Sequence, residues 1–552
     1  MISRISVEDR NVNSLHSTPQ AKKNGSQNPN FKGGAVWNAV LWGIQECEKN
    51  PMINVAVIDM LSAILPRTIV ESMTNWFAGF EAFRRESSGL IVNCLIPSYI
   101  TLLAAIGLNK AIMPKGTNMA NCWADSSLIE KASEIYKNTS GEDKIKSTFK
   151  EMIGNIEGFE GRGKDSKVLF KDVLSEKEIE AYAEKLKSLT ANNVDKKELK
   201  NAVKSITKEI TEKTGVCEHI TVGSGKNAVK ASSVESLLTD TAKFFKEFKT
   251  TSNLPIEEFA KKSKKLVRSK SLVGLAVILP LAASMQYINR WITKKISGVD
   301  GAPIYDDFGK NGENKEQNEA IRQKSKEGLL KQKFISISSM VGVALLSMMK
   351  LPSWNMLEFK GLFPTMDQAR IISTTTFASR MAVADDKNEL AEATVRDIAT
   401  FCGLYFLGDY AAKAAATAIE NKTGVSLLNE TKEIKKDANV FERFKHWVKD
   451  LSLKSSEEVS SKAAKMAKAK GLDAKQAEKE IKRAVNLRSA CQAANIGVSL
   501  VLLGLIVPIF TRHKTKKKHA EALKLAQENS SSNVNDKNTE TNVPTKVAIA
   551  KA

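Results

Sequence analysis

The sequence predicts an all-α, multi-spanning helical membrane protein with a polar helical domain and disordered termini. Residues Ser271–Asn289 include no charged side chain, and at about 1.5 Å per residue a helix of this length roughly crosses a hydrocarbon layer of about 30 Å. Helix-forming residues dominate the chain, aromatic residues make up 6%, and only 13 of 552 residues are proline, which favours helices. Basic residues flank the apolar stretch on both sides: Lys261, Lys262, Lys264, Lys265, Arg268 and Lys270 before it, and Arg290, Lys294 and Lys295 after it.

The net charge of the chain narrows the choice of partners. Lysine and arginine number 83 against 62 acidic residues, a net charge of +21, and such an excess suits nucleic acid or an anionic membrane surface. The densest basic runs, at 261–270, 290–295 and 512–518, adjoin apolar runs. We therefore expect the lipid bilayer, with anionic headgroups, as the partner. Nucleic acid is not expected, because the sequence has no zinc-finger, RNP-like or helix-turn-helix pattern.

The chain begins with a polar, turn-rich segment, residues 1–35, which we expect to be disordered. It lacks the apolar core of a cleavable signal peptide, so internal spans are expected to place the protein in a plasma or inner membrane. Residues 36–113 are expected to form interfacial helices and the first membrane span. Within them, 52–65 is short for a span and contains Asp59, which favours a core helix or a re-entrant segment.

The next apolar segments surround a polar region. Residues 69–83 place Trp76, Phe80 and Phe83 on one helical face, as in a helix along the membrane interface or in an ordinary packing face. Gly89–Met113 is the first predicted span, and Pro97 is expected to kink it. Residues 114–270 are expected to form a polar helical domain outside the lipid, through which protein partners could bind.

Residues 271–351 are expected to hold two spans joined by a charged connector, 290–333. These spans are Ser271–Asn289, with a kink at Pro280, and Phe334–Leu351. A helical region, 352–493, follows. In it, the dense cluster of charges from Arg380 to Asp397 is expected to be a solvated, salt-bridged surface rather than a site for a divalent cation.

Residues 398–419, a possible further embedded helix, are long enough to span but contain Asp409 and Lys413. These lie four residues apart and can pair on one face, so this helix either spans or packs in the bundle or at the surface. Residues 434–451 form a basic amphipathic helix that lies on anionic lipid or docks on its own domain.

The last apolar run is preceded by local helix signals. Gly471 is expected to end one helix, and Asp473 with Gln476 forms a capping box for the next. Ala494–Thr511 is the last predicted span, with a kink at Pro508, and 512–552 is a basic, then polar, disordered tail.

The distribution of charge also predicts an orientation. The connector 290–333 carries ten lysines and arginines, and basic residues in short loops remain on the cytoplasmic side. Placing the connector and the tail inside gives four spans, with both termini inside and 114–270 outside. The alternative keeps 261–270 inside and uses 398–419 as a fifth span.

No motif predicts a reaction. The six cysteines are widely separated, and the five histidines show no HExxH spacing. The segment TVGSGKN, 221–227, is not a P-loop, because residue 220 is Ile and Asn227 follows Lys226. GFEGRG, 158–163, is expected to be a turn with no strand before it. We therefore predict no catalytic, cofactor-binding or metal-binding residue.

Two sets of residues remain as functional candidates. Asp59, Asp409 and Lys413 are membrane-embedded ionisable candidates, and Pro97, Pro280 and Pro508 are helix-kink candidates. The favoured hypothesis is a non-catalytic structural or partner-recruiting membrane protein. The alternative is a transporter or channel-like protein that uses kinked helices and buried charges, and a membrane enzyme ranks last.

Overall fold

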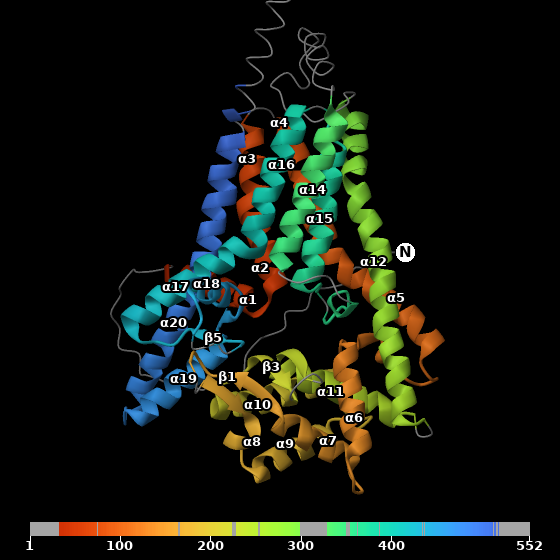
Figure 1. Cartoon of the computed structure of the whole chain (residues 1–552), viewed down its shortest axis with the longest axis vertical. Helices are drawn as coiled ribbons and strands as arrows, with labels where there is room; N and C mark the ends of the chain where they lie inside the picture. Colours follow the sequence, from red (N-terminus) through yellow and green to blue (C-terminus); the bar gives the residue numbers. More distant parts are fainter. Residues whose placement is uncertain are drawn as a thin grey trace, which may run out of the picture. The chain divides into compact units, whose positions relative to one another are not determined.

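A computed structural model describes residues 33–517, with gaps at 74–75, 164–165, 224–227, 252–253, 298–327, 349–353, 362, 386, 433, 435–436, 512 and 515–516. The tails predicted to be disordered therefore lie almost entirely outside the described residues. Helix α1 (Gly33–Lys49) contains the boundary between two compact units, residues 1–42 and 43–552, and the elements below belong to the second unit. Helices predominate, as predicted (Figure 1).

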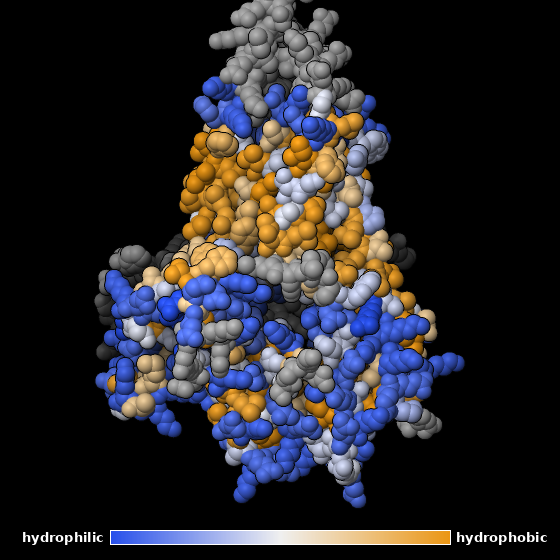
Figure 2. Space-filling view, in the orientation of Figure 1, coloured by the Kyte–Doolittle hydropathy of each residue, from blue (hydrophilic) through white to orange (hydrophobic). Residues whose placement is uncertain are grey.

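Five helical stretches are long and apolar enough to cross a membrane: Pro51–Ser72, Trp76–Ile112, Ile256–Ile296, Leu329–Met348 and Ala474–Thr511. The last four contain most of each of the four spans predicted from the sequence. Figure 2 shows a hydrophobic band that covers the helices of this bundle and a largely hydrophilic surface over the polar domain. A band of apolar side chains facing outward is stable in lipid and costly in water.

The fifth candidate span differs from the predicted one. Residues 398–419 do not qualify; they lie in a continuous helix whose Phe401 and Tyr405 are buried against neighbouring helices. Instead, the helix that starts at Pro51 continues through Pro66 to Ser72. The single helix predicted at 69–83 is interrupted by a turn at Met73. The side chains of Trp76, Phe80 and Phe83 are exposed.

The bundle consists of α2 (Pro51–Ile58), η1 (Asp59–Ile64), α3 (Leu65–Ser72), α4 (Trp76–Leu90), η2 (Ile91–Leu95), α5 (Ile96–Ile112), α12 (Ile256–Ser297), α14 (Leu329–Met348), α15 (Met366–Ala382), α16 (Lys387–Cys402), η7 (Gly403–Leu407), α17 (Gly408–Thr423), α20 (Ala474–Ser499) and η8 (Leu500–Ile506).

Three prolines of the bundle follow π-helical segments. Segments η1, η2 and η8 each end two residues before a proline, namely Pro66, Pro97 and Pro508. Proline has no N–H and crowds the carbonyl four residues earlier, and a wider π turn accommodates both. Pro280 lies within α12, where no π turn is assigned.

The polar region after α5 is mainly helical and also contains a small antiparallel sheet, which the sequence did not predict. Its helices are η3 (Met119–Asn121), α6 (Ser126–Asn138), α7 (Lys144–Gly154), α8 (Phe170–Val173), α9 (Glu176–Ser188), α10 (Lys196–Thr214) and α11 (Val234–Lys249). In its core, Phe245 packs edge to face against Phe149 and Phe244, with ring centroids 5.8 and 5.3 Å apart.

An antiparallel sheet covers part of this core. Its order is β2 (Lys167–Leu169), β1 (Ile156–Phe159), β3 (Glu218–Val222), β4 (Val229–Ser233). Ile156 pairs with Val222, and Ile220 with Ala231. GFEGRG therefore begins inside a strand, which corrects the prediction of a turn with no strand before it. Of TVGSGKN, the last four residues lie outside the described residues.

A small module between α17 and α20 completes the described chain. It contains β5 (Leu428–Glu430), α18 (Val440–Lys449), β6 (Leu451–Leu453) and α19 (Ser456–Ala469); the short η6 (Trp354–Met356) precedes α15. Leu428 pairs with Leu453 across its two strands. The predicted end of α19 is confirmed by Gly471 with φ +64°, and the predicted capping box of α20 by the Asp473 and Gln476 hydrogen bonds.

One buried carboxylate fastens this module to the polar domain. Glu458 accepts hydrogen bonds from the backbone N–H groups of Cys217 (2.8 Å) and Glu218 (3.0 Å) at the start of β3. Its other oxygen accepts from the N–H of Ser455 and from the side chain of Asn429. A carboxylate buried with four donors replaces the hydration that it loses, so α19 and β3 are held in register.

Candidate functional site: a buried ion network in the helix bundle

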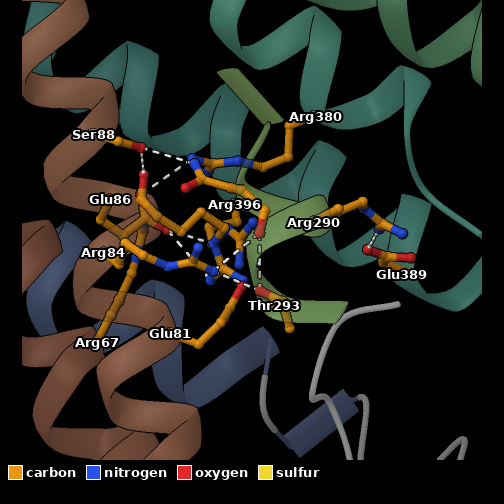
Figure 3. Close-up of polar contacts among 12 residues, drawn as sticks. Arg67, Glu81, Arg84, Glu86, Ser88, Arg290, Thr293, Arg380, Glu389 and Arg396 are labelled. Atoms are coloured by element: carbon orange, nitrogen blue, oxygen red, sulfur yellow. Dashed lines mark hydrogen bonds and ion pairs between the residues drawn. The ribbon is translucent and has the colours of Figure 1, made fainter. Parts of the chain in front are cut away.

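The strongest concentration of buried charge lies where α3, α4, α15 and α16 meet (Figure 3). Arg380 of α15 donates to Asp397 of α16 (2.7 Å) and to Glu86 of α4 (3.3 Å). Arg67 of α3 forms an ion pair with the same oxygen of Glu86, Oε2, at 3.2 Å. The four side chains therefore connect four helices through charge-assisted hydrogen bonds, which are the stronger kind.

Further charges surround this centre. Arg85 contacts Glu81 (3.2 Å) and Glu86 (3.5 Å), and Arg396 contacts Asp397 (3.3 Å). Arg67 also donates to the hydroxyl of Thr400 at 2.6 Å. Four guanidinium groups thus face three carboxylates, and each ion has an oppositely charged neighbour, which is what burial of charge requires.

The network reaches α12 through neutral groups. Arg84 donates to the backbone carbonyl of Asn289 (3.0 Å) and to the hydroxyl of Thr293 (2.5 Å), and Asn289 donates to Ser88 (2.8 Å). The next residue of α12, Arg290, contacts the carboxylates of Asp385 and Glu389, as Figure 3 shows for Glu389. The polar end of α12 is thereby tied to α4 and to the start of α16.

A small polar cavity adjoins the network. It has a volume of about 20 Å³, roughly the room for one water molecule. The polar and charged residues in its wall include Asp59, Glu86, Arg380, Asn93, Thr376 and Tyr405. Asn93 accepts from Thr376 at 2.8 Å. Asp59 thus adds a further carboxyl group to the cavity wall, which it shares with Arg380 and Glu86.

The structure separates the three predicted ionisable candidates. Asp59 lines the cavity, whereas Asp409 and Lys413 lie elsewhere on α17. Among the described contacts these two form no ion pair, contrary to the expected pairing: Asp409 accepts from Asn495 of α20 (3.0 Å), and Lys413 donates to the carbonyl of Val448 (2.8 Å). Each of the two side chains therefore contacts a group on a neighbouring helix rather than the residue four positions away on α17.

The charge cluster from Arg380 to Asp397 also differs from its prediction. Its two ends, Arg380 and Asp397, are buried and belong to an interior network, whereas Asp385, 41% exposed, and half-buried Glu389 form the expected salt bridges, with Arg290. Asp386 lies outside the described residues. Helix α15 antiparallel to α16 places both ends of the cluster inside the bundle, which residue spacing alone does not reveal.

Sequence reasoning missed Arg67 and Glu86 as network members. A signal was present, since Arg67 stands in a helix that is otherwise apolar enough to span a membrane, and such residues are rare and paired there. Glu86 was not recognised from the sequence, because it directly follows Arg84 and Arg85 and therefore resembles a charge that flanks a helix. Its partners come from helices that are far away in the chain.

The chemistry available at this site is electrostatic. The described residues contain no group of three or more His, Cys, Asp or Glu side chains arranged to hold a metal ion. The network can hold helices in register, and the cavity beside Asp59 can take one water. No protein-family model, curated protein sequence or solved structure matches this chain.

Proposed function

We propose that this protein is a non-catalytic structural membrane protein that holds its polar domain at the membrane surface to recruit protein partners. The observation that carries the proposal is the pairing of the buried charges. Arg67, Glu86, Arg380 and Asp397 each contact an oppositely charged group in the bundle. Because each charge is already paired, the network favours one fixed arrangement of the helices. A transporter instead needs charged groups that change partners during its transport cycle.

The attachment of the polar domain to the bundle supports the same function. Glu358, buried just before α15, accepts from both the N–H (2.8 Å) and the hydroxyl (2.7 Å) of Ser126 at the start of α6. Lys270 of α12 donates to the carbonyl of Cys122 (2.7 Å) and lies 4.1 Å from the centre of the Trp123 ring. These contacts orient the domain relative to α12, as a platform for partners requires.

Photo-crosslinking in native membranes tests the recruiting role. A photoreactive residue replaces Lys177, which is exposed on α9 of the polar domain, and a second variant carries it at Leu346, exposed on α14 of the bundle. We expect a discrete protein adduct from position 177 and lipid adducts from position 346. Absence of a reproducible protein adduct from several exposed positions of the domain contradicts partner recruitment.

A second candidate function, transport, rests on the cavity beside Asp59. Asp59 begins the π-helical segment η1, and π turns often occur at functional sites. In this case Asp59 binds a cation or proton during a transport cycle. Solute or proton flux in reconstituted vesicles that Asp59→Asn abolishes favours transport, and absence of flux in the wild type favours the structural role.

The five candidate spans also suggest a revised topology. An odd number of spans puts the segments before α2 and after α20 on opposite faces, rather than both inside. In this topology the loop between the third and fourth candidate spans, 298–327, and the residues after 511 share the cytoplasmic face of the membrane. The polar domain then lies on the opposite face. Labelling of single cysteines introduced at Thr139 and in the connector, from each side of the membrane, tests this arrangement. Labelling of both positions from the same side contradicts it.

A further inference from the structure

A basic cleft lies between α6 and α12 in the polar domain. Its volume is about 500 Å³. The charged residues that line it are Glu130, Glu257, Lys261, Lys264, Lys265 and Arg268. The cleft is separate from the ion network and borders the contact of Glu358 with Ser126. It is large enough for a phosphate-bearing headgroup.

The acidic residues of the cleft are already neutralised. Glu130 forms an ion pair with Lys264 (2.6 Å), and Glu257 with Lys137 (3.3 Å). Arg268 contacts Glu358. Lys261 and Lys265, one turn apart on α12, are exposed and form no ion pair with any described residue. Two ammonium groups therefore face the cleft without counter-ions, and an anion would find charge to bind there.

The cleft is continuous with a lipid-facing surface. Helix α12 runs without interruption from the cleft into the uncharged stretch 271–289, and Lys265 precedes Ser271 by only six residues, or about 9 Å. The headgroup layer adds about 5–8 Å on each side of the hydrocarbon, so Lys265 lies near its outer edge and Lys261 one turn further out. Lys261, Lys265 and Leu272 recur at helical spacing on one face, and Leu272 is exposed.

Exposed apolar side chains continue along α12 beyond the cleft. Leu272, Val273 and Val277 are each more than two-fifths exposed. A molecule that places an anionic group at Lys261 and Lys265 could therefore rest an acyl chain against Leu272, on the same face, and against Val273 and Val277 further round the helix. Neither a soluble anion nor a neutral lipid uses both parts of the site.

We propose that this cleft binds the phosphate of an anionic phospholipid, with Lys261 and Lys265 as its cationic contacts and the outer face of α12 against an acyl chain. Lysine binds phosphate as a point charge, and basic residues beside a membrane span attract anionic lipid. The inference rests on the proposed placement in a membrane, but it concerns a specific site and not the charge of the surface as a whole.

Native mass spectrometry of the detergent-solubilised full chain tests the proposal, with phosphatidylglycerol and phosphatidylcholine as probes. We expect the wild type to retain phosphatidylglycerol preferentially, and Lys261→Gln with Lys265→Gln to bind it about thirtyfold more weakly. The matched control is Lys196→Gln with Lys200→Gln, two exposed lysines at the same spacing on α10, which should bind as the wild type does. Lys261→Arg with Lys265→Arg should retain binding, because the charge remains.

Three of the outcomes that overturn the proposal concern lipid preference and the variants. These are equal retention of the two lipids, equal loss of binding in the control variant, and unchanged binding in the double glutamine variant. Competition by glycerol 3-phosphate or inorganic phosphate at the same concentration as the lipid indicates a site for free anions instead. Resistance of the protein to extraction from vesicles by alkaline washing is measured separately. A protein that resists extraction but shows no lipid preference refutes the lipid site and leaves the membrane placement intact.

Discussion

Arg380 and Asp397 form a 2.7 Å ion pair in which the side chains are only 6% and 0% exposed. They belong to antiparallel helices α15 and α16, and Glu86 extends the pair to α4 and, through Arg67, to α3. Each charge is stable in the interior only because the others are present, since removing one partner leaves an uncompensated buried ion.

Neutralising Asp397 should therefore destabilise the whole bundle. We expect Asp397→Asn to lower the free energy of unfolding by about 3 kcal/mol. The detergent-solubilised protein is unfolded by titration with sodium dodecyl sulfate, and loss of helix is followed by circular dichroism. The matched control is Glu480→Gln, which removes an exposed contact with Arg483 and should cost less than about 0.5 kcal/mol. Equal effects of the two changes would contradict a structural role for the network.

Close packing of α12 against α5 depends on Gly274. A Cβ at this position would lie 2.5 Å from the hydroxyl oxygen of Thr101 and 3.5 Å from its Cα, and small residues permit such approach between membrane helices. We expect Gly274→Val to destabilise the protein by about 2 kcal/mol through overpacking.

Gly342 provides the comparison, because a Cβ there meets nothing within 4 Å. Gly342→Val should leave the thermal unfolding midpoint in detergent close to that of the wild type, whereas Gly274→Val should lower it. A similar midpoint for both variants would show that α5 and α12 do not depend on this approach.

The junction of the polar domain with α19 should respond to pH. Burial, reinforced by the neighbouring Glu458 and Glu457 carboxylates, raises the pKa of Glu218 to about 8 from its usual 4.5. The folded protein then holds this proton more tightly than the unfolded chain, so its contribution to stability is complete below about pH 4.5 and is lost as the pH rises through about 8.

We expect the thermal midpoint of the wild type to fall between pH 5 and pH 8 more than that of Glu218→Gln, which cannot ionise. Comparison of the two proteins isolates this residue, because the other titrating groups are common to both. Parallel pH profiles would place the carboxyl of Glu218 in a solvated environment.

Helix α18 should lie on lipid rather than dock on its own domain. Phe441 and Phe444 are 73% and 61% exposed, while Trp447 packs near Tyr410 of α17, with ring centroids 6.1 Å apart. An environment-sensitive fluorophore on Phe444→Cys should shift to shorter wavelength when the protein enters vesicles. The same label on Lys196→Cys in the polar domain should not shift. Water-like emission from both positions would contradict contact with lipid.

Several features follow from the sequence because their causes are local. The uncharged stretch 271–289 and its basic flanks predict a span by length and hydropathy alone, and α12 contains it. The capping box of Asp473 and Gln476 is equally local, since its hydrogen bonds join residues three apart. Backbone geometry fixes such contacts whatever the rest of the chain does.

Other features were decided only by the tertiary structure. Pro66 predicts the end of a helix, but a π turn and the surrounding bundle carry the helix past it. Asp409 and Lys413 have the spacing of an ion pair, yet each contacts another helix or loop. Glu86 and Arg380, 294 residues apart, could not be matched from the sequence. The free energy of a buried charge depends on which groups replace its lost water, and only the packing of the helices brings those groups together.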